Sequence, residues 1–78
     1  MPGMAGATRA DVTVDGRAYT VWYTDRQVEV VRHGWAGAGA HQQIRDTMIA
    51  LIGQVTGCKL NEASLHGDSG EMRGTIRC

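Results

Sequence analysis

Hydrophobic and polar positions alternate along most of this chain, and one longer periodic stretch interrupts the alternation. Three runs before residue 34 repeat with a period of two, which is typical of half-buried β-strands. Asp15-Gly16 separates the first two runs and predicts a two-residue hairpin turn that pairs Val14 with Arg17. The three predicted strands are residues 11–14, 17–24 and 28–33.

This pairing sorts the side chains of the three strands onto two faces. One face is apolar and is expected to lie under a helix: Val12, Val14, Tyr19, Val21, Tyr23, Val28 and Val30. The other face is open and carries Thr13, Ala18, Thr20, Trp22, Glu29, Val31 and His33. On the open face we expect Trp22 opposite Glu29 and Thr20 opposite Val31.

The helix is predicted after a connection rich in glycine and alanine at residues 34–40. Its apolar stripe repeats at helical spacing and consists of Ile44, Met48, Leu51, Ile52 and Val55. Gly57 suits the left-handed residue that ends a helix, and Gly53 suits a close approach to the sheet. No capping side chain precedes His41, so the helix start is poorly capped.

The last 21 residues, from Cys58 to Cys78, read as a hairpin around the turn Gly67–Gly70. A register whose paired numbers sum to 136 keeps the apolar positions on one face. It pairs Leu60 with Ile76, Ser64 with Met72 and Cys58 with Cys78. Such a pair of cysteines can be two buried thiols, a disulfide or a redox pair, and thiols are the default in a reducing compartment.

Together these elements predict an α+β fold, a five-stranded, mostly antiparallel sheet in the order β-β-β-α-β-β with one helix on one face. We expect a flexible N-terminal tail at residues 1–9 and a single domain at 10–78. The favoured spatial order of strands is third, second, first, fifth, fourth, with third, second, first, fourth, fifth as the alternative. Both orders place the final hairpin beside the first strand.

Composition narrows the function classes. Eight basic and eight acidic residues cancel, which disfavours nucleic acid as a partner, because phosphate binding needs a basic excess. No stretch is long and apolar enough for a membrane span, and the first residues lack the pattern of a secretory signal. We therefore expect a cytoplasmic protein with reduced thiols, no membrane partner and no cofactor.

The glycine-rich connection before the helix is one candidate site. Flexible glycines followed by a helix N-terminus can cradle an anion. The residues that would form an anion or small-ligand site are Gly37, Gly39, His41 and Arg45, with Arg32 as a further helper. The spacing departs from the dinucleotide-binding fingerprint and from the P-loop.

Two other chemical patterns are weaker. Gly67-Asp68-Ser69-Gly70 resembles the tetrapeptide around the nucleophile of trypsin-like serine proteases. That family needs two β-barrels with distant His and Asp partners, which this chain is too short to hold, so a hairpin turn is the better interpretation. The three histidines and two cysteines show no metal-ligand spacing, and we predict no metal site and no catalytic residues.

The open sheet face is the leading candidate site. Trp22 beside mostly uncharged, β-branched neighbours is a reasonable anchor for a protein partner or a second copy. The residues expected to form this surface are Trp22, Val31, Thr20, Thr13 and Trp35. The sequence therefore favours a small, non-enzymatic protein-interaction module that binds a protein partner or a second copy of itself, with ligand or anion binding as the alternative.

Overall fold

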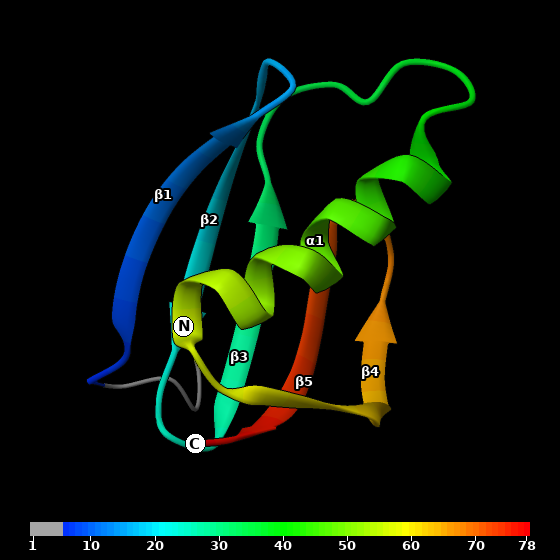
Figure 1. Cartoon of the computed structure of the whole chain (residues 1–78). Helices are drawn as coiled ribbons and strands as arrows, with labels where there is room; N and C mark the ends of the chain where they lie inside the picture. The colour runs from blue at the N-terminus through cyan, green and yellow to red at the C-terminus, as the bar shows by residue number, and fades with distance from the viewer. Residues whose placement is uncertain (1–5) are drawn as a thin grey trace.

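In the computed structural model, which describes residues 6–78, five strands form one open antiparallel sheet and one helix crosses a single face of it (Figure 1). The expected α+β class and β-β-β-α-β-β order are confirmed. The elements are β1 (Thr8–Val14), β2 (Arg17–Tyr23), β3 (Gln27–Arg32), α1 (His41–Thr56), β4 (Lys59–Gly67) and β5 (Glu71–Arg77). The last two residues of the expected tail thus belong to β1, and residues 1–5 lie outside the described part of the chain.

The first three strands pair in the predicted register. Val14 lies opposite Arg17, and Asp15 and Gly16 both have positive φ, as the two-residue turn requires. Trp22 pairs with Glu29, and Thr20 pairs with Val31. The alternation of side chains therefore places the predicted apolar face under α1.

The core lies between that face and the helix. Its buried side chains come from β2, β3, β5, the apolar stripe of α1 and the loop before α1, and Val12, Val14, Tyr23 and Val55 pack around it. The buried residues are Tyr19, Val21, Val28, Val30, Ala36, Ile44, Met48, Leu51, Ile52, Met72 and Ile76. One helix on one sheet thus suffices to enclose the core.

The spatial order of the strands is β1-β2-β3-β5-β4, so both predicted orders were wrong. The final hairpin joins the sheet at β3 instead of β1. β5 pairs antiparallel with both β3 and β4, which makes β3 and β4 parallel and leaves β5 in the slot between them. Apolar β3 therefore becomes central, whereas β1, which carries Arg9 and Asp11, stays at an edge, as charged strands often do.

The closing hairpin keeps the predicted register for only half its length. Leu60 pairs with Ile76 as expected, but Met72 pairs with Gly67 instead of Ser64. The register shifts between Asn61 and His66, and Figure 1 shows β4 turning a corner there. The Ser64 hydroxyl holds this bulge closed, since it donates to the Asn61 carbonyl oxygen (2.6 Å) and accepts the Thr75 amide (2.8 Å).

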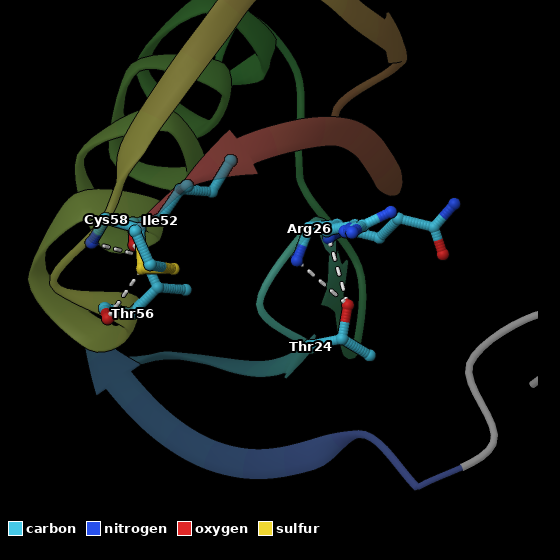
Figure 2. Close-up of a disulfide and its surroundings, with 7 residues drawn as sticks. Thr24, Arg26, Ile52, Thr56 and Cys58 are labelled. Carbon is cyan, nitrogen blue, oxygen red and sulfur yellow. Dashed lines mark hydrogen bonds between the residues drawn. A yellow bond between two sulfur atoms is a disulfide. The ribbon is translucent and has the colours of Figure 1, made fainter.

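The two cysteines face each other as predicted, but they form a disulfide, so the expectation of free thiols was wrong. Cys58 and Cys78 have Cα atoms 4.4 Å apart and bridge the open end of the hairpin. Figure 2 shows Cys58 directly after the end of α1, where the Thr56 hydroxyl donates to the Ile52 carbonyl and accepts the Cys58 amide (3.1 Å). The disulfide thereby ties the helix end to Cys78.

The helix ends as predicted and begins uncapped. Gly57 has φ 68° and donates its amide to the Gly53 carbonyl (2.9 Å). Gly53 itself does not approach the sheet, because a Cβ at this position would meet no atom within 4 Å. At the start, Ala40 occupies the N-cap position and offers no side-chain hydrogen bond.

Candidate functional site

Side chains from β3 and α1 meet at the turn between β4 and β5. His41 Nδ1 lies 2.5 Å from Ser69 Oγ, and Arg45 Nη1 donates to the Gly67 carbonyl oxygen (3.1 Å). Arg32, the last residue of β3, lies against the same turn through its backbone and side chain. We call these five residues the turn cluster: Arg32, His41, Arg45, Asp68 and Ser69.

Arg32 is the unusual member of the turn cluster. Its amide donates to the Gly70 carbonyl (3.0 Å), which seats the end of β3 on the turn. Its Nε and Nη1 are buried and have no hydrogen-bond partner, and no other buried side-chain nitrogen or oxygen within residues 6–78 shares this condition. Unpaired buried donors are costly, so these two nitrogens favour an acceptor at Arg32.

Asp68 supplies the nearest carboxylate, but the turn itself uses it. Asp68 Oδ1 accepts the amides of Gly70 (2.7 Å) and Glu71 (3.2 Å). These backbone hydrogen bonds lower the pKa of Asp68, and the charges of Arg32 and Arg45 lower it further. One carboxylate therefore faces two guanidinium groups, and the cluster keeps a positive excess.

The start of α1 adds to this positive excess. The first intrahelical bond runs from the Ile44 amide to the Ala40 carbonyl (3.0 Å), so the preceding amides have no intrahelical acceptor. The first turn contains no acidic residue. Cations near a helix N-terminus are unfavourable, so two arginines at this end of the molecule favour an anion as their counter-charge.

The structure brings together only part of the predicted anion site. His41 and Arg45 both reach the β4–β5 turn, and the helper Arg32 lies there too. Gly37 and Gly39 lie in the loop before α1, where their φ angles of 77° and 76° suit glycine. No periodic or spacing signal in the sequence links Ser69 or Asp68 to this site, because only the fold places their turn beside the helix.

The tetrapeptide that resembles a protease motif builds the turn. Ser69 is 7% exposed and bonds His41, which is the first step of a nucleophile-and-base arrangement. Asp68, the only acid of the turn, accepts backbone amides instead of orienting the imidazole. In the described chain His41 has no carboxylate partner, so we assign the Ser69–His41 bond a structural role that fastens the turn to the helix.

The open sheet face proves more charged than expected. A row of paired positions crosses all five strands in the order Arg9, Trp22, Glu29, Arg73, His66. The Arg9 guanidinium lies 5.1 Å above the Trp22 ring, which is half-buried. Alternating charges around one shielded tryptophan replace the mostly uncharged surface that the sequence predicted.

The other residues of the predicted interaction surface differ in exposure. Thr20 is buried, and its hydroxyl donates to Asp11 Oδ1 (2.7 Å) and lies 2.7 Å from His33 Nε2. Val31 is half-buried, and Thr13 is exposed. Trp35 lies in the loop beyond β3 and is 89% exposed. The predicted set is therefore one continuous sheet face plus a separate exposed tryptophan.

A carboxyl pair lies in the middle of the open face. Arg73 Nε contacts Glu71 Oε2 at 2.6 Å and Glu29 Oε2 at 3.5 Å. Burial, followed by the hydrogen bond to Glu71, raises the pKa of Glu29 to about 7. The same hydrogen bond lowers the pKa of Glu71. Below that pKa, the protonated Glu29 carboxyl is therefore the donor and the Glu71 carboxylate, which Arg73 also binds, is the acceptor.

One groove lies apart from both candidate sites. A groove of about 780 Å³ runs between the second half of α1 and the corner of β4. It is lined by apolar Ile49 and Leu60 and by charged Lys59 and Glu62. It contains no residue of the turn cluster and presents both charge signs, so it favours no single ligand class.

Within residues 6–78, no helix has the length and apolarity needed to cross a membrane, and no group of three or more candidate side chains is placed to hold a metal ion. Comparison with protein-family models, curated proteins and solved structures found no match to this chain. The turn cluster and the open face are therefore the two features from which a function can be inferred.

Proposed function

We propose that the turn cluster binds a small oxyanion, a phosphate or carboxylate group. The observation that carries the proposal is the pair of buried, unpartnered nitrogens on Arg32. A guanidinium presents its donors in a planar fork that matches two oxygens of a carboxylate or phosphate. The forks are Nε with Nη2 and Nη1 with Nη2, so an oxyanion bound at either fork of Arg32 satisfies one of the two unpartnered donors and balances the positive excess of the cluster.

The other members have distinct parts in this proposal. Arg45 adds a second positive charge beside the turn, and the free amides at the start of α1 add donors to the same anion. His41 and Ser69 hold the turn against the helix. Asp68 repels a highly charged ligand, so the site suits a small anion better than a polyphosphate.

Phosphate titration followed by NMR tests the proposal. Sodium phosphate is added to the full chain at constant ionic strength, and the Arg32 side-chain Nε–H signal and the backbone amides of His41 and Ser69 are followed. We expect these signals to move first and to saturate in the millimolar range. Arg32→Gln should weaken binding at least about tenfold, because it removes charge-assisted hydrogen bonds.

Arg26→Gln is the matched control. Arg26 is exposed in the β2–β3 turn, so the substitution removes one positive charge far from the turn cluster. It should leave the phosphate affinity unchanged. If Arg26→Gln weakens binding as much as Arg32→Gln, or if the Arg32 signal does not respond to phosphate, no specific anion site exists at the turn cluster.

The protein-interaction role of the open face stays a second proposal. Its support is that α1 covers only the other face, while Trp22 and two arginines, residue types common at interfaces, lie on this one. Light scattering and partner capture on the wild type and on Trp22→Ala test it. A strict monomer that retains no partner contradicts the open face as an interface.

The disulfide is evidence about the cellular compartment of the protein. The sequence favours the cytoplasm, but disulfides persist mainly in oxidising compartments. The Cys58–Cys78 bridge is therefore an observation against a cytoplasmic location. Alkylation of thiols in rapidly acid-quenched cells, followed by mass spectrometry, distinguishes the two cases: alkylated cysteines support the cytoplasm, and an intact disulfide supports an oxidising compartment.

A further inference from the structure

The outer edge of β1 is a long, regular strand edge that no described element covers. All seven residues of β1 pair with β2 without a bulge, and Figure 1 shows no other helix or strand of residues 6–78 along its outer side. The opposite edge of the sheet differs, because the register shift in β4 interrupts it. Bulges protect edges from pairing with another chain, and β1 lacks this protection.

The turn geometry determines which backbone groups of β1 face outward. The two-residue turn makes Val14 and Arg17 a hydrogen-bonded pair. Hydrogen-bonded and non-hydrogen-bonded pairs alternate along an antiparallel ladder, so Val12 and Ala10 also bond β2. The amides and carbonyls of Arg9, Asp11 and Thr13 therefore point away from the sheet, ready to bond another strand.

A second copy of β1 can pair with this edge in only some registers. A two-fold axis between antiparallel strands keeps both helices on the same side, so the paired residue numbers must sum to an even number. A sum of 20 places Arg9 opposite the partner's Asp11 and Asp11 opposite the partner's Arg9. It also sets Ala10 at the two-fold axis, where opposite Cα atoms of a non-hydrogen-bonded pair are closest and a small side chain fits.

Neighbouring registers lack this complementarity. A sum of 18 sets Arg9 opposite itself, and a sum of 22 sets Asp11 opposite itself, so each brings like charges together. A sum of 24 places Asp11 opposite the partner's Thr13, and it places Arg9 opposite position 15 of the partner, which lies in the turn beyond β1. The charge pattern of β1 therefore selects one self-pairing register.

We propose that the chain forms a two-fold homodimer through antiparallel pairing of its β1 edges, centred on Ala10, which extends the sheet to ten strands. Arg9 and Asp11 already form an ion pair within one chain (3.2 Å), and both side chains remain more than half exposed. In the dimer they make a four-residue ring with the partner's Arg9 and the partner's Asp11. The turn cluster takes no part, so the dimer and the anion site are independent.

Charge reversal with rescue tests this pairing. Sedimentation equilibrium is measured on the wild type, on Arg9→Asp, on Asp11→Arg, and on the double variant that carries both substitutions. Each single reversal places like charges opposite each other twice and should weaken dimerisation about tenfold. The double variant restores opposite charges and should recover the dimer.

Three results would overturn the proposal. A wild-type chain that stays monomeric to millimolar concentration has no such interface. If neither single reversal weakens dimerisation, or if the double variant does not restore it, the dimer uses another surface. A dimer lost in Trp22→Ala but kept in Arg9→Asp places the interface on the open face. Arg26→Asp, a charge reversal in the β2–β3 turn, should leave dimerisation unchanged.

Hydrogen exchange gives an independent measurement. Raising the protein concentration should slow exchange of the outward amides of Arg9 and Asp11, whereas the amides of Ala10 and Val12 already bond β2 and should change little. Concentration-dependent protection that alternates between neighbouring amides of β1 identifies a newly paired edge. Concentration-dependent protection without alternation in β1 contradicts the proposed pairing.

Discussion

At the scale of single residues, two glycines of similar appearance in the sequence have opposite roles. A Cβ at Gly53 meets nothing, whereas a Cβ at Gly74 would lie 3.1 Å from Leu60 Cδ1 and 3.3 Å from Ser64 Oγ. We expect Gly53→Ala to stabilise the fold by about 0.5–1 kcal/mol, since alanine is the better helix former. Gly74→Ala should destabilise it by about 1–3 kcal/mol through overpacking at the β4 bulge.

Urea denaturation of the two alanine variants checks this pair of opposite effects. The two variants make the same chemical change, so each serves as the control for the other. Equal destabilisation by both would mean that Gly53 is packed against a neighbour. A neutral Gly74→Ala would mean that the bulge is loose enough to accept a methyl group.

The raised pKa of Glu29 predicts that the folded protein loses stability as pH rises. Its pKa is about 7 in the folded protein and near 4.5 when unfolded, so the folded state binds the proton more tightly. This contribution is fully present below pH about 4.5 and is lost as pH rises through about 7. We expect the wild type to lose about 1–3 kcal/mol of unfolding free energy between pH 5 and pH 8 from this group.

Glu29→Gln should flatten this part of the stability profile. A glutamine amide donates to Glu71 at every pH, as the protonated Glu29 carboxyl does at low pH. Urea denaturation at pH 5, 6, 7 and 8 measures the profile, and Glu62→Gln, at an exposed position on β4, is the control. An unchanged slope in Glu29→Gln would assign the pH dependence to other groups.

At the scale of elements, local patterns predicted what local forces decide. Three local predictions are confirmed: the Asp15-Gly16 turn, the helix stripe and the Gly57 helix end. Each depends only on residues that are close together in the sequence. The β4 bulge was not predictable in this way. It depends on Ser64 reaching across to Thr75 and on Gly74 leaving room beneath it, which alternation within either strand does not reveal.

The closing hairpin depends on its disulfide. Cys58 and Cys78 are 20 residues apart, and a bridge across a loop of this length stabilises by about 3 kcal/mol in the chain-entropy model. We expect Cys58→Ser/Cys78→Ser to lose about this much in urea denaturation, and a reducing agent to have the same effect on the wild type. The reducing agent should not change the stability of the double variant. If it does, or if it leaves the stability of the wild type unchanged, the bridge does not stabilise the hairpin in this way.

At the scale of the whole molecule, the strand order decides where the candidate site forms. The sequence named Arg32, His41 and Arg45 without a reason for them to meet the turn Gly67–Gly70. They meet because β5 pairs with β3, which sets the β4–β5 turn beside the end of β3 and the start of α1. Long-range pairing of this kind is invisible to periodicity, so Asp68 and Ser69 could not be assigned from sequence.

The same strand order predicts a pattern of hydrogen exchange. β3 bonds β2 on one side and β5 on the other, and Val28 and Val30 lie in the core, so β3 amides should exchange only through global unfolding. The β2-bonded amides of Ala10 and Val12 belong to an edge strand and should exchange faster, through local opening. The measurement is made on Arg9→Asp at low concentration, which keeps β1 unpaired. Slower exchange in β1 than in β3 would instead support the order in which β1 is central, and the turn cluster would then lose its structural basis.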